Sequence, residues 1–308
     1  MIITDEKDAE IIRNSIIEGK DEAIIDIITQ RTYHQICKIS NTFNKIYNKD
    51  LISELKKFFF DKGNLEDICI SLITNSIEND CNYLHKAIKS IPKDLETITE
   101  ILSTRTSLII KQINEKYKEL YKYEGKDLIK EIECSFDGFI KNILISLLTV
   151  KRSENNYPNY DECQNYAKKL KLKDINEWIE EDSFFTKIFT QNSPMEISYI
   201  SKIYHKFAGF TILQGINNKL NDDDVKIFLQ NFIFAILSPS EYFATKLNEA
   251  IIRKNDKIIT RILVSRHDFD MEEIKHCYFQ LYGKELSKEL KDIYSGLYYK
   301  VINKLVGI

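Results

Sequence analysis

One stretch decides the fold: Ile24-Ile25-Asp26-Ile27-Ile28-Thr29-Gln30-Arg31-Thr32. It returns as Ile98-Thr99-Glu100-Ile101-Leu102-Ser103-Thr104-Arg105-Thr106 and as Ile259-Thr260-Arg261-Ile262-Leu263-Val264-Ser265-Arg266-His267. A weaker copy reads Phe185-Thr186-Lys187-Ile188-Phe189-Thr190-Gln191-Asn192-Ser193. The equivalent positions Arg31, Arg105, Asn192 and Arg266 are 74, 87 and 74 residues apart. Such self-similarity indicates a repeat architecture, and the longer middle spacing predicts two pairs of repeats joined by a linker.

The surroundings of the stretch recur as well. A helical pattern, expected to be the first helix of the repeat, precedes the stretch. Two further helical patterns, the third and fourth helices, follow it. A short turn that ends in an acidic residue and a leucine separates these two. A glycine turn then opens a last apolar helix, at Gly63, Gly138 and Gly296. Only nine Gly and four Pro occur in 308 residues, which leaves few turn formers for a many-stranded β protein. The sequence predicts an all-α chain with five helices in each repeat of about 70 residues.

This pattern resembles the annexin repeat. In the second copy it reads Leu84-His85-Lys86-Ala87-Ile88, then Thr99 to Thr106, then Lys116-Tyr117 onward to Asp127-Leu128. The resemblance implies four annexin repeats of five helices each in a slightly curved disc, at residues 5–75, 76–150, 161–237 and 238–308, with a linker at 151–160. A generic helical solenoid would explain the helices but not the five-helix unit or its spacing.

The resemblance also implies calcium-dependent binding to acidic phospholipids. In annexins, a glycine-rich loop between the first two helices turns backbone carbonyls toward Ca²⁺, and an acidic side chain near the end of the fourth helix completes the site. Such a hard ion takes six to eight oxygen ligands. Here the first and fourth repeats are about two residues shorter in this loop than the second, and the second carries Pro92. We therefore expect degenerate calcium loops.

Acidic residues still suggest candidate Ca²⁺ ligands. In repeat one, Gly19 is the remaining glycine of the first loop, and Asp61 lies near the expected acidic position at the end of the fourth helix. Repeat three is richest in charge, with these candidates: Asp174, Glu180, Glu181, Asp182, Asp222, Asp223 and Asp224. Alternatively, acidic residues at helix starts serve as caps that favour the helix dipole.

Membrane contact has its own candidates. Trp178, the only tryptophan, occupies a loop position that in some annexins inserts toward the bilayer, which suits an amphipathic indole; the alternative is burial against Phe184 and Phe185. Basic residues of the other loops suggest a calcium-free route to anionic lipid, unless they are simply solvated: Lys20, Lys89, Lys93, Arg253 and Lys254.

The family resemblance further implies a central polar channel lined by Asp80, Glu100, Arg105 and Arg266. Because a buried charge must be paired, we expect Arg105 and Arg266 to meet carboxylates, and structural pairing between repeats is the alternative to ion conduction.

Other classes of function find little support. The five histidines form no metal-binding or catalytic motif, there is no glycine-rich phosphate loop, and we expect no enzyme. Nucleic acid is not an expected partner, because the net charge is −3. Six scattered cysteines predict buried free thiols. No targeting segment or membrane span is evident, which favours a cytoplasmic protein.

Two functions follow from the sequence. The first is peripheral binding to acidic phospholipid membranes, with Ca²⁺ as a cofactor in the family but with degenerate loops here. The second is a cytoskeleton-associated or scaffold homologue, similar to the divergent alpha-giardin-like annexins, that has lost calcium-dependent lipid binding and binds a cytoskeletal protein instead.

Overall fold

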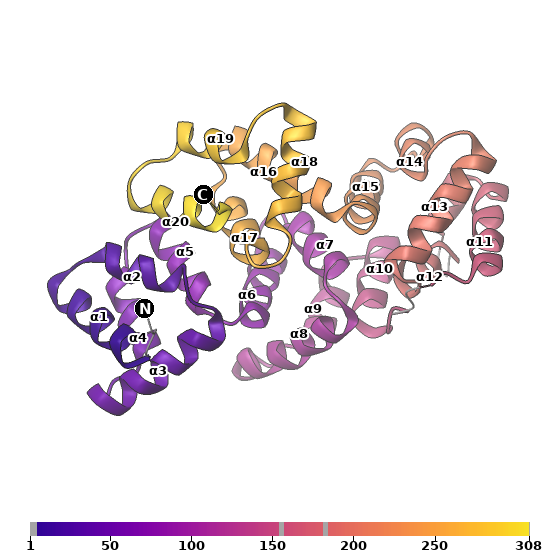
Figure 1. The fold of residues 1–308 in the computed structure, drawn as a ribbon. Coiled ribbons are helices and arrows are strands. Elements are labelled where there is room, and N and C mark those ends of the chain that lie inside the picture. The colour runs from indigo at the N-terminus through magenta and orange to yellow at the C-terminus, as the bar shows by residue number, and fades with distance from the viewer. Residues whose placement is uncertain (1–4, 154–156, 181–183, 308) are drawn as a thin grey trace. The chain divides into compact units, whose positions relative to one another are not determined.

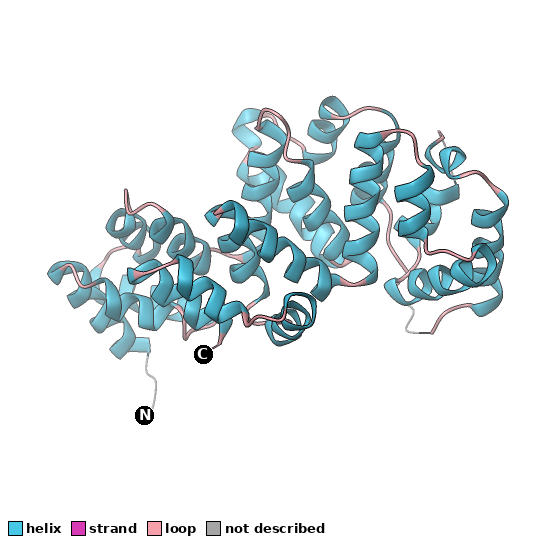
Figure 2. Ribbon diagram, turned by 90° about the horizontal axis from the view of Figure 1, so that it is seen from above, coloured by secondary structure: helices cyan, strands magenta, loops and turns pink. Residues whose placement is uncertain are grey.

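The computed structural model describes residues 5–153, 157–180 and 184–307. These residues form twenty α-helices and two short 3₁₀ helices, and no strand occurs among them (Figures 1 and 2). The predicted all-α fold of four five-helix repeats is thereby confirmed.

The helices fall into four groups of five. Repeat one comprises α1 (Asp5–Glu18), α2 (Asp21–Ile28), α3 (Tyr33–Tyr47), α4 (Leu51–Phe59) and α5 (Asn64–Ile73). Repeat two comprises α6 (Ser76–Lys89), α7 (Leu95–Thr104), α8 (Ser107–Leu120), α9 (Leu128–Ser135) and α10 (Gly138–Thr149), with the 3₁₀ turn η1 (Lys122–Glu124). Repeat three comprises α11 (Tyr160–Leu172), η2 (Ile175–Ile179), α12 (Phe184–Gln191), α13 (Pro194–Ala208), α14 (Ile212–Lys219) and α15 (Asp223–Leu237). Repeat four comprises α16 (Pro239–Arg253), α17 (Asp256–Arg266), α18 (Met271–Tyr282), α19 (Leu286–Ile293) and α20 (Gly296–Val306).

Packing pairs the repeats differently from their spacing along the chain. One compact unit joins the chain up to Asn79 with the chain from Phe243 onward, and the other runs from Asp80 to Tyr242. In the first unit, α5 packs against α17 and α20; in the second, α7 packs against α15. The spacing groups repeat one with two and repeat three with four, whereas the packing groups one with four and two with three.

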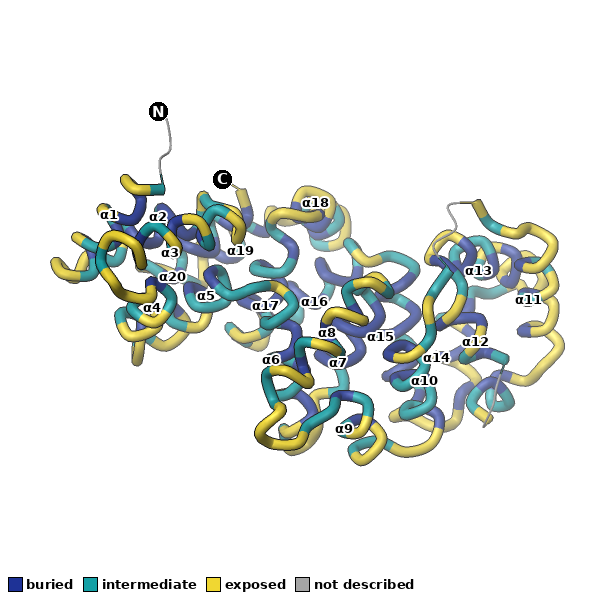
Figure 3. The backbone as a smooth tube through the Cα atoms, turned by 90° about the horizontal axis from the view of Figure 1, so that it is seen from below, coloured by how far each residue is buried: buried dark blue, intermediate teal, exposed yellow. Residues whose placement is uncertain are grey.

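The recurring sequence has a structural cause at each position. Its apolar residues lie in the core, and the second helices, such as α7, are among the most buried parts of the chain (Figure 3). Its last hydroxyl residue caps the third helix: Thr32 accepts from the Gln35 backbone N–H, Thr106 from Ile109 and Ser193 from Glu196. A hydroxyl cap satisfies an otherwise unpaired helix N–H. The repeated motif therefore encodes where a helix begins.

The glycine turns also have a clear role. Gly63, Gly138 and Gly296 stand at the start of the fifth helices with φ angles of 57°, 56° and 67°. Side chains disfavour this left-handed region, so glycine suits the reversal. All six cysteines are free thiols, as expected, but only Cys69, Cys81 and Cys163 are buried, while Cys37 and Cys277 are half-buried and Cys134 is exposed.

Candidate functional site

The candidate site in each repeat is a pair of loops. We call the connection between the first and second helices the first loop, and the connection between the fourth and fifth helices the fourth loop. In repeat one, Lys62 of the fourth loop reaches Asp21 at the start of α2, with Nζ 2.5 Å from Oδ1. The same ammonium lies 3.9 Å from the centroid of the Phe58 ring. A cation supplied by the chain itself thus links the two loops where the resemblance implies Ca²⁺.

The two candidate Ca²⁺ ligands of repeat one, Gly19 and Asp61, occupy turn positions with positive φ angles. Gly19 has a φ of 71°, and the next residue, Lys20, donates its backbone N–H to the Ser15 carbonyl. Asp61 has a φ of 62° and donates its backbone N–H to Glu66 at 2.8 Å.

In repeat two the carbonyl oxygens of the first loop have donors from the loop itself. Lys93 Nζ donates to the Ile88 carbonyl at 2.8 Å. The Ser90 hydroxyl lies 2.8 Å and 2.9 Å from the carbonyl oxygens of Ala87 and Pro92. These contacts use part of the acceptor capacity of the three carbonyl oxygens.

Repeat four uses a tyrosine. The Tyr294 hydroxyl, at the end of α19, donates to the Asp256 carboxylate at the start of α17, and the Asn64 amide donates to the same carboxylate. Burial, reinforced by Asp256, raises the pKa of Tyr294, so its hydroxyl keeps the proton that it donates. Asp256 is therefore occupied by neutral donors.

In repeat three an asparagine joins the loops. Asn176 Nδ2 donates to the Lys219 carbonyl at 3.2 Å, and Asn176 Oδ1 accepts from the Asn221 N–H at 3.1 Å. The Asp174 carboxylate accepts from the Asn176 backbone N–H at 2.9 Å, and these hydrogen bonds hold the pKa of Asp174 below its usual value. Asp222 caps α15 through the Val225 N–H.

The other acidic candidates of repeat three form no ligand cluster in the part of the chain that is described. Asp223 pairs with Lys226 at 2.8 Å, while Asp224 and Glu180 are exposed. Glu181 and Asp182 lie outside the described residues. Within the described ranges, no group of three or more His, Cys, Asp or Glu side chains could hold a metal ion. In repeats one, two and four, oxygens of these loops accept hydrogen bonds from lysine, serine, tyrosine and asparagine donors.

Trp178 does not lie at the surface. Its side chain is fully buried, its indole N–H donates to the Leu170 carbonyl at 3.2 Å, and its ring stacks on Phe185 at 5.4 Å between centroids. The alternative of burial therefore applies, against Phe185 and, on another side, Tyr204 at 5.7 Å. The indole is buried in this structure, and its insertion toward lipid on calcium binding stays a prediction.

The five candidate cations differ in their surroundings. Lys20 pairs with Glu18 at 2.6 Å, Lys89 pairs with Glu124 at 2.9 Å, and Lys93 binds its own loop. Arg253 and Lys254 are exposed and have no ion-pair partner among the described residues.

A feature that the sequence reading missed lies beside these cations. The first loop of every repeat, or the helix end that precedes it, carries an exposed aliphatic side chain: Ile17 (65% exposed), Ile91 (99%), Leu172 (83%) and Ile252 (72%). Each has a lysine or arginine within three residues along the chain. The sequence did contain a signal for this feature. At the end of the first helix, an aliphatic residue falls outside the helical period of the core positions, which indicates an exposed apolar side chain.

The predicted arginine pairs are confirmed. Arg105 Nε and Nη2 lie 2.7 Å and 2.9 Å from the two Asp80 carboxylate oxygens, and Arg31 holds Asp8 in the same way. Arg266 pairs instead with Asp270 and lies 4.6 Å from the centroid of the Phe243 ring. Phe243 replaces the aspartate in repeat four. It lies eight residues before Ile251, just as Asp8 lies eight before Ile16 and Asp80 eight before Ile88.

The other channel candidates divide between the two units. Asp80, Glu100 and Arg105 belong to the unit of repeats two and three, where Glu100 is fully buried, and Arg266 belongs to the other unit. Ion conduction by these residues stays a prediction. No helix among the described residues is long and apolar enough to cross a bilayer.

Known proteins share this sequence and fold. The family model described as Annexin matches residues 7–72, 79–147 and 242–305. Annexin A1 of Equus caballus is 32% identical over 298 residues, covering 94% of this chain and 83% of its own length. The solved structure of annexin III superposes with a TM-score of 0.91 at 25% identity, covering 100% of this chain and 95% of its own. The calcium-bound structure of alpha-14 giardin shares the fold at 17% identity, with a TM-score of 0.79 and 98% and 99% coverage. The chain belongs to the annexin family.

Proposed function

We propose that this annexin binds acidic phospholipid surfaces peripherally, through loop cations and exposed aliphatic side chains, with little dependence on calcium. One observation carries the proposal: in every repeat the first loop, or the helix end that precedes it, presents an exposed aliphatic side chain within three residues of a lysine or arginine. An exposed aliphatic group is costly in water and favourable at the acyl boundary of a bilayer, while a nearby cation is attracted by anionic headgroups.

The magnitudes suit reversible attachment. Full burial of an Ile or Leu side chain is worth about 1.5–3 kcal/mol, and a basic residue near an anionic surface about 1 kcal/mol. Lys20 and Lys89 contribute less, because each already has a carboxylate partner. Repeat four, with Ile252, Arg253 and Lys254, should contribute most.

Calcium has a minor part in this proposal. Lys62, Lys93 and Tyr294 hold the oxygens that an ion would need in repeats one, two and four. Any remaining response should arise in repeat three, where the Asp222, Asp223 and Asp224 carboxylates are exposed. Alanine replacement of these three aspartates should then abolish it.

Sedimentation with phosphatidylserine vesicles, in calcium and in chelator, tests the proposal. We expect pelleting in both conditions, weakened by added salt because the cationic part is screened. Pelleting that requires calcium would contradict the calcium-free route. No pelleting in either condition would exclude membrane binding and leave the scaffold function.

Two matched variants locate the contact. Ile91→Asp places a carboxylate at the most exposed aliphatic position and should reduce pelleting in chelator. Leu108→Asp makes the same kind of change at an exposed residue near the start of α8, outside the first loops, and should not. Equal effects of the two variants would refute the assignment of the first loops.

A further inference from the structure

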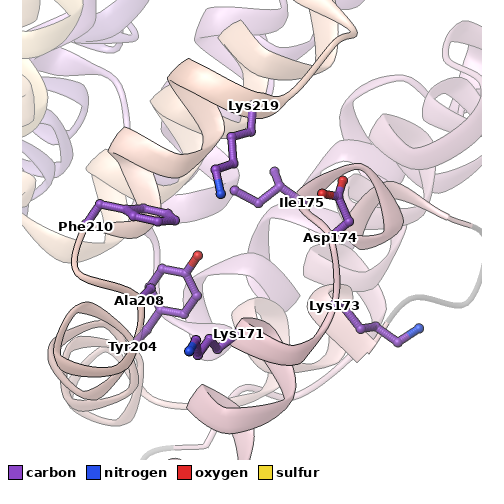
Figure 4. A pocket seen from close by; sticks show the side chains of 8 residues that line it. All are labelled: Lys171, Lys173, Asp174, Ile175, Tyr204, Ala208, Phe210 and Lys219. Atoms are coloured by element: carbon purple, nitrogen blue, oxygen red, sulfur yellow. The ribbon is translucent and has the colours of Figure 1, made fainter.

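A pocket of about 240 Å³ lies in repeat three between the end of α11, the first loop, α13 and α14 (Figure 4). Its lining combines cations, one carboxylate and an aromatic floor: Lys171, Lys173, Asp174, Ile175, Tyr204, Ala208, Phe210 and Lys219. A small polar ligand fits this space.

Tyr204 is the unusual residue of the pocket. Its side chain is only 2% exposed, yet its hydroxyl has no hydrogen-bond partner among the described residues and points into the pocket (Figure 4). Its ring is held by edge contacts with Trp178 and Phe210, at 5.7 Å and 6.0 Å between centroids. Burial raises the pKa of Tyr204 to about 12, so the hydroxyl remains a neutral donor at neutral pH. The hydroxyl opens onto the pocket, where a ligand oxygen can accept its hydrogen bond.

The charges around this hydroxyl favour an anion. The Lys219 ammonium points into the pocket, 4.7 Å from the Phe210 ring centroid, and Lys171 lies across from it (Figure 4). Lys173 points away, toward Glu177 at 3.7 Å. Asp174 is the one acid of the lining, and its carboxylate already accepts two hydrogen bonds from Asn176. Because Lys173 is directed to Glu177, Lys171 and Lys219 against Asp174 leave the lining with one net positive charge.

We propose that this pocket binds a phosphate monoester, whose oxygens accept hydrogen bonds from the Tyr204 hydroxyl and from the ammonium groups of Lys219 and Lys171. A monoester dianion offers one negative charge to each of these two lysines and has enough acceptors for all three donors. The binding needs neither calcium nor a bilayer, so it goes beyond the proposed function. The phosphate comes either from a soluble phosphorylated metabolite or from the headgroup of a lipid such as phosphatidic acid.

Calorimetric titration with glycerol 3-phosphate, in chelator, tests the site directly. Wild-type protein should show saturable binding. Lys219→Gln and Tyr204→Phe should each weaken it about tenfold, since each removes one hydrogen bond to a charged group. Tyr204→Phe keeps the ring that packs on Trp178. Lys168→Gln removes an exposed charge from the same helix as Lys171, outside the pocket lining, and should leave the affinity unchanged.

Two results would overturn the inference: no saturable binding by the wild type, or an equal loss in Lys168→Gln, which would mean that only the surface charge matters. Vesicles then distinguish the sources. If the ligand is a lipid headgroup, Lys219→Gln should lower pelleting with phosphatidic acid more than with phosphatidylglycerol, a diester. If it is soluble, glycerol 3-phosphate should bind while the two lipids pellet the variant equally. A pocket that fails these tests while phosphatidylserine vesicles still pellet the protein leaves the proposed function intact.

Discussion

Arg105→Met should destabilise the unit of repeats two and three strongly. The guanidinium makes two hydrogen bonds to Asp80, and the two side chains are only 12% and 6% exposed. Methionine fills much of the arginine volume but leaves the Asp80 carboxylate buried without its cation. Breaking a buried ion pair by removing one partner costs about 3–5 kcal/mol, whereas replacing both partners by apolar residues is often close to neutral.

We therefore expect Arg105→Met to lower the free energy of unfolding by about 3 kcal/mol, and the double variant Arg105→Met with Asp80→Leu to recover most of that loss. Lys111→Met is the control, because Lys111 and its partner Glu115 are 74% and 69% exposed at a separation of 4.0 Å. Such a surface pair is worth at most about 1 kcal/mol.

Urea unfolding followed by tryptophan fluorescence measures these effects in the relevant unit. Trp178 is the only tryptophan, it is fully buried, and it belongs to the same unit as Asp80 and Arg105. A loss below about 1 kcal/mol in Arg105→Met would show that water or another group replaces the arginine at no great cost. A double variant no more stable than the single one would show that the cost does not arise from the orphaned carboxylate.

Three further predictions follow from buried groups. Acrylamide should quench Trp178 fluorescence equally with and without phosphatidylserine vesicles, because the indole is fully buried; protection by vesicles would contradict that burial. Burial lowers the pKa of His85 below its ordinary 6.5, so the unfolded chain binds the proton more readily than the folded chain does. The free energy of unfolding should therefore fall as the pH drops below about 6.5. The His85→Gln variant should lack this part of the pH dependence when urea midpoints are compared. Gly215→Ala would place its Cβ 2.7 Å from Ile175 and 2.8 Å from Phe210, and we expect a loss of about 1–3 kcal/mol by thermal unfolding; an unchanged midpoint would show that both side chains move aside freely.

Sequence reasoning predicted the features that depend on local periodicity. The recurring stretch located the second helix of every repeat, and in repeats one to three its final hydroxyl residue proved to be the cap of the third helix. The arginine pairs were also predictable in kind, because a charge on a helix that faces the core needs a carboxylate partner. The place of that partner varies: Asp8 lies 23 residues before Arg31, Asp80 lies 25 residues before Arg105, and Asp270 follows Arg266. These inferences require only the helical period and the cost of burying a charge.

Contacts between distant residues were beyond that reasoning. The grouping of repeat one with repeat four depends on how complete helices pack, which the spacing of short motifs does not contain. The burial of Trp178 depends on the space left by Phe185 and Tyr204. Lys62 lies 41 residues from Asp21, and no pattern in the sequence marks the two as partners. Tyr294 and Asp256 are likewise separated by 38 residues.

The difference between caps and loops has a physical origin. Losing a helix cap costs about 1 kcal/mol of fold stability, so a residue such as Thr106 is constrained by the fold itself. A calcium loop is constrained only by what it binds, since an open Ca²⁺ site offers positions to lipid oxygens but does little for the packing of the helices. The Lys62 ammonium links the same two loops by its hydrogen bond to Asp21. Unlike a bound Ca²⁺ ion, it has no vacant coordination position for a phosphate oxygen of a lipid. On the function proposed above, attraction to a membrane comes from groups that remain free, such as Arg253 beside Ile252, and it should be weak in each repeat, sensitive to salt and indifferent to chelator.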